Sequence, residues 1–263
     1  MSKFTSIAKA LGIALAIFIV LMMISGIMFV GNFFTDSKGE ENLIVKTIDD
    51  ANFDTLDLDV DYVDLKVTVS DEFRLETNIK DITLENIESS LKIASKSKFK
   101  WKNKNKVINL EIPRDLILKK VNLEIGAGKI DIYNLEADNW NVSLGVSKTY
   151  FSNIKSSGKA RIENGMGALE LDNCNFNTLD LKNGMGSSVV KATLGDNVRM
   201  ENGLGSIDLN VLDELDNFDI KLFNGMGSVT VNDKEIDENI VTTGSKKLEL
   251  ENGLGSINIH FIS

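Results

Sequence analysis

Residues 163–173, ENGMGALELDN, contain a short phrase that returns along the chain. KNGMGSSVVKA begins at residue 182, ENGLGSIDLNV at 201, FNGMGSVTVND at 223 and ENGLGSINIHF at 251. The register extends back to EIGAGKIDI and SLGVSKTYF, so the first glycines of the seven units are Gly126, Gly145, Gly165, Gly184, Gly203, Gly225 and Gly253. A period near 19 residues is typical of repeated supersecondary units. We therefore predict that every unit turns the same corner, where glycine tolerates a positive φ or a close neighbour.

The residues on both sides of each corner alternate as in β-strands. Leu181, Asn183 and Met185 share one face of the first strand, and Val190 faces inward on the second. Equivalent residues recur in the next unit, which favours a parallel β-solenoid of about 19–20 residues per coil, with coils stacked about 4.8 Å apart. Asn-Gly between alternating strands is also a hairpin signal, so an antiparallel meander is the competing fold.

One polar residue shares its parity with the buried positions. Ile125 and Leu144 occupy this place in the two earliest units, and asparagine occupies it in the others: Asn164, Asn183, Asn202, Asn224 and Asn252. We predict that these amides point inward or lie at the corner, each bonding to its neighbours above and below, because unpaired buried amides are costly.

The N-terminal residues predict the compartment. Residues 10–34 are an uncharged apolar run long enough to cross a bilayer, whereas a cleaved signal peptide would have a shorter one. Lys3 and Lys9 precede this run, which places residues 1–9 in the cytoplasm by the positive-inside rule. We expect a single-pass cell-membrane protein with a transmembrane helix at 10–34, a linker at 35–44 and an extracytoplasmic remainder.

That remainder divides into two segments. Residues 45–118 have weaker periodicity and are interpreted as divergent β coils with a cap, and residues 119–263 as the repeat solenoid. The chain stops three residues after His260, so the last coil is expected to leave an open edge through which copies could self-associate.

Composition excludes several functions. A net charge of −10 disfavours nucleic-acid binding. Cys174 is the one cysteine and His260 the one histidine, so neither a disulfide within the chain nor a Cys/His zinc site is expected, and no cofactor is predicted.

Two acidic patterns are candidate sites. Asp57, Asp59 and Asp61 alternate along a strand and could face calcium, but they lack the spacing of a calcium loop, so a solvated acidic face is preferred. Glu170 and Asp208 share an outward column about 10 Å apart, near the separation of an inverting glycosidase pair. The connections are too short to wall a catalytic groove, so we predict no enzyme activity. Cys174 is interpreted as a small core residue.

The stretch IPRDLILKKVNLEIGAGKIDIYNLEADNWNVSLGVSKTYF, followed by NG-[ML]-G units, resembles the bacterial "putative adhesin" family of β-strand repeat domains, whose function is unknown. The resemblance covers roughly residues 45–263 and implies a right-handed β-helix at a bacterial cell surface, with no catalytic residues to carry over. We expect a non-enzymatic binding or scaffolding module at the envelope that contacts protein or polysaccharide. The alternative is an envelope-stress sensor or modulator acting through a partner membrane protein.

Overall fold

The computed structural model describes residues 43–48, 52–95, 106–237 and 244–262. These residues belong to one unit, residues 41–263, and form a sheet of 16 strands. The strands are β1 (Ile44–Lys46), β2 (Thr55–Ser70), β3 (Arg74–Thr77), β4 (Thr83–Ile87), β5 (Ser90–Ser95), β6 (Val107–Pro113), β7 (Leu118–Tyr133), β8 (Glu136–Ser152), β9 (Lys155–Asn183), β10 (Ser187–Asn202), β11 (Ser206–Val211), β12 (Phe218–Asn224), β13 (Ser228–Val231), β14 (Lys234–Glu235), β15 (Lys246–Asn252) and β16 (Ser256–Phe261). A short 3₁₀ turn, η1 (Leu215–Asn217), lies between β11 and β12.

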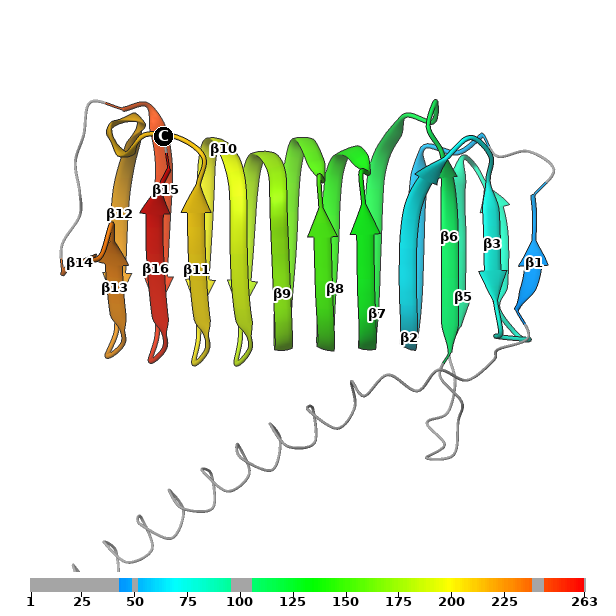
Figure 1. The fold of residues 1–263 in the computed structure, drawn as a ribbon, viewed down its shortest axis with the longest axis horizontal. Coiled ribbons are helices and arrows are strands. Elements are labelled where there is room, and N and C mark those ends of the chain that lie inside the picture. Colours follow the sequence, from blue (N-terminus) through cyan, green and yellow to red (C-terminus); the bar gives the residue numbers. More distant parts are fainter. Residues whose placement is uncertain (1–42, 49–51, 96–105, 238–243, 263) are drawn as a thin grey trace, which may run out of the picture. The chain divides into compact units, whose positions relative to one another are not determined.

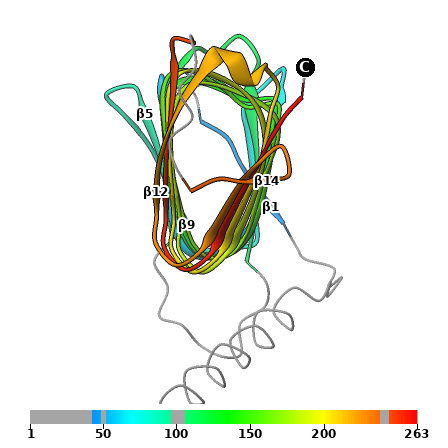
Figure 2. The same ribbon diagram turned by 90° about the vertical axis from the view of Figure 1, so that its left-hand side faces the viewer.

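The middle of the sheet consists of parallel strands in the register of the sequence repeat. Ile125 of β7 pairs with Leu144 of β8, and Leu144 pairs with Asn164 of β9. Strands of neighbouring units therefore lie side by side (Figure 1), and in the orthogonal view they lie one behind another while the strand β5 diverges (Figure 2). Equivalent residues meet because each unit repeats the same local conformation.

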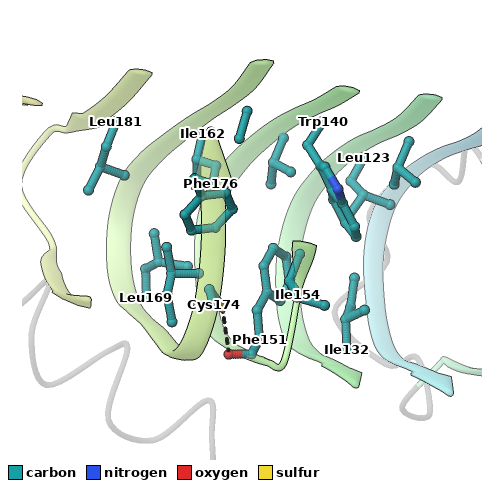
Figure 3. Packing of buried hydrophobic residues seen from close by; sticks show 14 of the residues in the cluster. Leu123, Ile132, Trp140, Phe151, Ile154, Ile162, Leu169, Cys174, Phe176 and Leu181 are labelled. Carbon is teal, nitrogen blue, oxygen red and sulfur yellow. Dashed lines mark hydrogen bonds between the residues drawn. The ribbon is translucent and has the colours of Figure 1, made fainter. Parts of the chain in front are cut away.

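The alternation of the strands gives one continuous apolar core. Trp140, Phe151 and Phe176 are fully buried in it among leucine and isoleucine side chains (Figure 3). The Trp140 indole N–H donates to the carbonyl oxygen of Lys155 at 3.1 Å, which satisfies the one polar atom of that buried side chain.

The order of the units in space departs from their order in the sequence at the C-terminal end. β15 pairs with β10 on one side and β12 on the other, and β16 pairs in the same way with β11 and β13. The last unit is thus inserted between the two that precede it. The C-terminal strand has both edges paired, so the expected open C-terminal edge is wrong. The outermost strands at that end are β12 and β14, and β14 pairs with β13.

The predicted fold class, a parallel right-handed β-helix, is wrong for the described residues. The chain forms a mixed sheet, with antiparallel pairs between β1 and β3, β3 and β6, β4 and β5, and β13 and β14. Two tight turns explain two of these pairs. Glu88 and Ser89 join β4 to β5, and Asn232 and Asp233 join β13 to β14, all four with positive φ. Two-residue turns of this kind reverse the chain into a hairpin.

The helical part of the prediction has a different outcome. Residues 10–34, on which the transmembrane helix was predicted, lie outside the described residues. Within the residues that are described, no helix is long and apolar enough to cross a membrane. The cell-membrane localisation therefore stays a prediction.

Residues 45–118 share the sheet with the repeats. β2 pairs in parallel with β7 along most of its length, and Val63 lies opposite Gly128. β2 also pairs with β5 and β6, so the repeat units continue directly into the N-terminal strands.

Candidate functional site at the repeated corner

The corner phrase has a defined local conformation. The Asn202 side-chain amide donates to the carbonyl oxygen of Gly205 at 2.9 Å, and Asn183 bonds Gly186 in the same way at 2.9 Å. The second glycine is required by contact with the neighbouring unit, because a Cβ on Gly205 would overlap the carbonyl oxygen of Gly186. Asparagine therefore holds the corner closed, and glycine lets the next corner lie against it.

A column of side-chain amides joins the corners. Asn164 donates to Asn183, Asn183 to Asn202 and Asn202 to Asn252, each at 2.9 Å, and Asn252 donates to Asn224 at 3.0 Å. Four of these side chains are at most 4% exposed: Asn164, Asn183, Asn202 and Asn252. Leu144 replaces asparagine in the unit before Asn164, and the buried Oδ1 of Asn164 has no hydrogen-bond partner among the described residues. The column is thus continuous over five units and ends against an apolar side chain.

The residue between the two glycines points outward in the same five units. These side chains are 43% to 85% exposed and form a continuous line that we call the apolar ridge: Met166, Met185, Leu204, Leu254 and Met226. Backbone hydrogen bonds of 2.9 to 3.0 Å between consecutive corners align them. In Figure 1 the corners joining β10 to β11, β15 to β16 and β12 to β13 are neighbouring loops at the lower ends of the strands.

The apolar ridge differs from the sequence expectation. Met185 was placed on the same face as Leu181 and Asn183, yet Leu181 is fully buried and Met185 is 53% exposed. The two-residue alternation of a strand does not continue through a corner, because the chain changes direction there. A contiguous exposed apolar line is a candidate interaction surface.

A shallow groove of about 570 Å³ runs beside the apolar ridge. Its lining includes the first glycines of four units and the outward residues that precede them, namely Glu163, Lys182, Glu201 and Glu251. Lys182 lies 3.0 Å from Glu201, and the hydrogen bond to Glu201 raises the pKa of Lys182. Arg199 contacts Glu201 at 2.8 Å and Glu251 at 3.0 Å. The charges along this groove are therefore largely paired within the chain.

The acidic pair weighed as catalytic is in the expected register. Glu170 pairs with Val189, and Val189 pairs with Asp208. Asp208 accepts a hydrogen bond of 2.7 Å from the Asn258 amide, which joins the acid to the inserted last unit. Neither carboxylate lines the groove beside the apolar ridge.

The acidic strand, part of β2, also pairs in register with its neighbours. Asp57 pairs in register with Lys92 and Asn122, and Asp59 pairs with Ala94 and Glu124. Among the described residues, no cluster of three or more His, Cys, Asp or Glu side chains is arranged to hold a metal ion.

Cys174 lies in the core. Its thiol contacts the carbonyl oxygen of Phe151 at 3.8 Å (Figure 3), and burial raises its pKa to about 11. A thiol with so high a pKa is a poor nucleophile at neutral pH.

Sequence reasoning missed a second amide column on the exposed side of the units. Asn153 donates to Asn134 at 2.9 Å, and Asn173 donates to Asn153 at 2.6 Å. All three residues have positive φ, a conformation that asparagine tolerates better than most residues. Their separations of 19 and 20 residues were the available signal.

No protein-family model matches the sequence, and comparison with curated proteins gives no match. Solved structures that are similar include a "putative adhesin" from Bacteroides fragilis NCTC 9343, 15% identical, with 85% of this chain and 98% of that chain covered and a TM-score of 0.43. A "putative adhesin" from Parabacteroides distasonis ATCC 8503 is 12% identical, covering 85% and 98%, with a TM-score of 0.40. A "putative cell adhesion protein" from Clostridium sporogenes ATCC 15579 is 14% identical, covering 85% and 100%, with a TM-score of 0.33. Because these sequence identities and TM-scores are low, the functional proposal rests on the residues of this chain alone.

Proposed function

We propose that this chain is a non-enzymatic binding and scaffolding module that acts through its repeated corner. The observation that carries the proposal is the apolar ridge, in which five neighbouring units each expose one methionine or leucine. Methionine and leucine at such exposure gain free energy when a partner removes them from water. The charged groups nearby are largely paired within the chain, which suits binding rather than proton transfer.

The corner is also held by several hydrogen bonds, which favours binding. The amides beneath Met185, Leu204 and Leu254 are buried and hydrogen-bonded both within the corner and to the next unit. A preorganised surface loses little conformational entropy when a partner docks. The ridge therefore presents its side chains at a constant spacing before any partner arrives.

Photo-crosslinking in cells tests this proposal. A photoreactive amino acid replaces Leu204 in the full-length chain, and the matched control carries it at Val189, an apolar residue of the neighbouring unit that is 40% exposed outside the ridge. We expect adducts at position 204 that exceed those at position 189 and that disappear when Met185 and Leu254 are both changed to Ser. Equal adduct formation at the two positions, or none at 204, would refute a binding role for the corner.

A further inference from the structure

We propose that the partner on the apolar ridge is a second copy of this chain, bound antiparallel so that Leu204 of one copy faces Leu204 of the other. This inference rests on the proposed binding role of the corner and names its partner.

The spacing of the ridge matches that of its own copy. Consecutive ridge residues are about 4.8 Å apart, so the five span about 19 Å. A partner must present apolar groups along a straight line at the same interval to contact all of them. A second ridge meets this requirement, because its side chains recur at the same interval and each can face one side chain of the first.

Charge complementarity selects the antiparallel arrangement. In order along the sheet, Leu204 is the middle residue of the ridge, Met185 is one unit to one side and Leu254 one unit to the other. Lys182 precedes Met185 and Glu251 precedes Leu254 by three residues each, and their side chains are 44% and 55% exposed. Each is paired within its own copy, Lys182 with Glu201 and Glu251 with Arg199. A twofold axis through Leu204 brings Lys182 of each copy opposite Glu251 of the other, where the two pairs can join into one network of alternating charge.

The remaining groups on that side of the ridge permit this contact. The Glu201 side chains of the two copies would face each other at the centre, but each is paired within its own copy with Lys182 and Arg199. The outer pair, Glu163 opposite Phe223, adds no ion pair. In a parallel arrangement the charged residues would instead face the other side of the partner's ridge. The residues two positions after each ridge residue are small and uncharged there: Ala168, Ser187, Ser206, Ser256 and Ser228.

The C-terminal end of the sheet is less suited to self-association. β15 and β16 are paired on both sides, and the outermost strand β12 exposes Asp219 and Lys221. Charged side chains on an edge strand oppose pairing with another copy. The ridge contributes five side chains, fewer than the roughly 20 to 30 residues a side of an average stable interface, so we expect a reversible, concentration-dependent dimer.

Single cysteines test the arrangement. Cys174 is the one native cysteine and is buried, so an engineered ridge cysteine is the only exposed thiol. After mild oxidation of the purified full-length chain, Leu204→Cys should form a disulfide-linked dimer. Met185→Cys and Leu254→Cys should each link poorly alone and link to each other when mixed. Strong linkage of Met185→Cys to itself would overturn the antiparallel arrangement.

The mass of the full-length chain in solution supplies a second measurement. Sedimentation should show a dimer that dissociates on dilution, is lost in Leu204→Arg and is retained in the matched control Val189→Arg. A wild-type chain that stays monomeric at its highest soluble concentration, with no Leu204→Cys linkage, would overturn the proposal. If the photo-adduct at position 204 contains a different molecule instead, the self-association fails while the binding role of the corner stands. If position 204 gives no adduct, both fail.

Discussion

The side-chain amide of Asn202 donates a 2.9 Å hydrogen bond to Oδ1 of Asn252, a residue 50 positions later in the chain. The unit of Asn224 lies between them in the sequence but beyond Asn252 in space. The last unit, which contains Asn252, is therefore inserted in the sheet between the units of Asn202 and Asn224, which both precede it in the sequence.

Replacing a central amide of the column should destabilise the fold. Asn202→Leu removes the acceptor of Asn183 and the donor to Asn252 in a buried place, which should cost about 1 to 3 kcal/mol of unfolding free energy. Urea unfolding of the variant measures it. Asn164→Leu is the matched control with a smaller expected loss, because Asn164 already abuts Leu144 and its Oδ1 has no partner among the described residues. Equal losses would argue against cooperation along the column.

The second glycine of the corner should be the less replaceable one. A Cβ on Gly205 would overlap the carbonyl oxygen of Gly186. A Cβ on Gly203 would lie 2.9 Å from the carbonyl oxygen of Gly184. We expect Gly205→Ala to lower the melting temperature more than Gly203→Ala, with a cost of about 1 to 3 kcal/mol or more for Gly205→Ala. A reversed order in thermal melts would contradict the close stacking of the corners.

An ion pair that joins the loop after β11 to the inserted strand β15 should make stability depend on pH in acid. Lys246 donates to Asp213 at 2.6 Å and to the carbonyl oxygen of Leu194 at 2.9 Å. Burial opposes ionisation of Asp213, but hydrogen bonds from Lys246, the Glu214 N–H and Asn217 outweigh it and lower the pKa below 3.8. This stabilisation is present above about pH 4 and is lost as the pH falls through the folded pKa.

We expect Asp213→Asn to cost about 1 to 3 kcal/mol at neutral pH and to flatten the acid limb of stability against pH. Asp71→Asn serves as the comparison, because Asp71 and Arg114 form a highly exposed pair that should contribute about 0 to 1 kcal/mol. Urea unfolding at several pH values measures both variants, and an unchanged acid limb in Asp213→Asn would disprove the role of the pair.

The buried thiol should produce an alkaline loss of stability. Burial raises the pKa of Cys174 from its ordinary 9.0 to about 11, so the unfolded chain releases this proton first as the pH rises. The contribution is complete below about pH 9 and is lost between pH 9 and 11, amounting to roughly 3 kcal/mol. Cys174→Ala should remove this part of the slope, while the lysines titrate alike in both chains. Parallel alkaline slopes for wild type and variant would show that the thiol does not contribute.

The corner is only partly predictable from the sequence. The 19-residue spacing indicated that Asn183 and Asn202 occupy equivalent places, and in the structure they are hydrogen-bonded neighbours. The outward turn of Met185 and Leu204 could not be read from alternation, because the rule of opposite faces holds only while a strand stays extended. The candidate surface therefore emerged only from the three-dimensional path of the chain.

The hairpin between β13 and β14, unlike the outward turn of the corner, follows a local sequence signal. Asn232 and Asp233 make a two-residue turn, and residues of this type at two successive positions are a recognised hairpin signal. The same signal at Asn-Gly in the corners does not produce hairpins, because the second glycine and the buried amide lead the chain into a parallel neighbour instead. Local sequence is ambiguous between these outcomes until the adjacent unit is in place.

The sequence by itself determined the repeated corner: asparagine, two glycines and one apolar residue impose the same conformation wherever they occur, since these constraints are local. Only the tertiary structure decided which units are neighbours. Asn252 can accept a hydrogen bond from Asn202 as readily as Asn224 could, so equivalent units are interchangeable in local energy. Their order depends on contacts made across the whole sheet, such as the ion pair of Lys246 with Asp213.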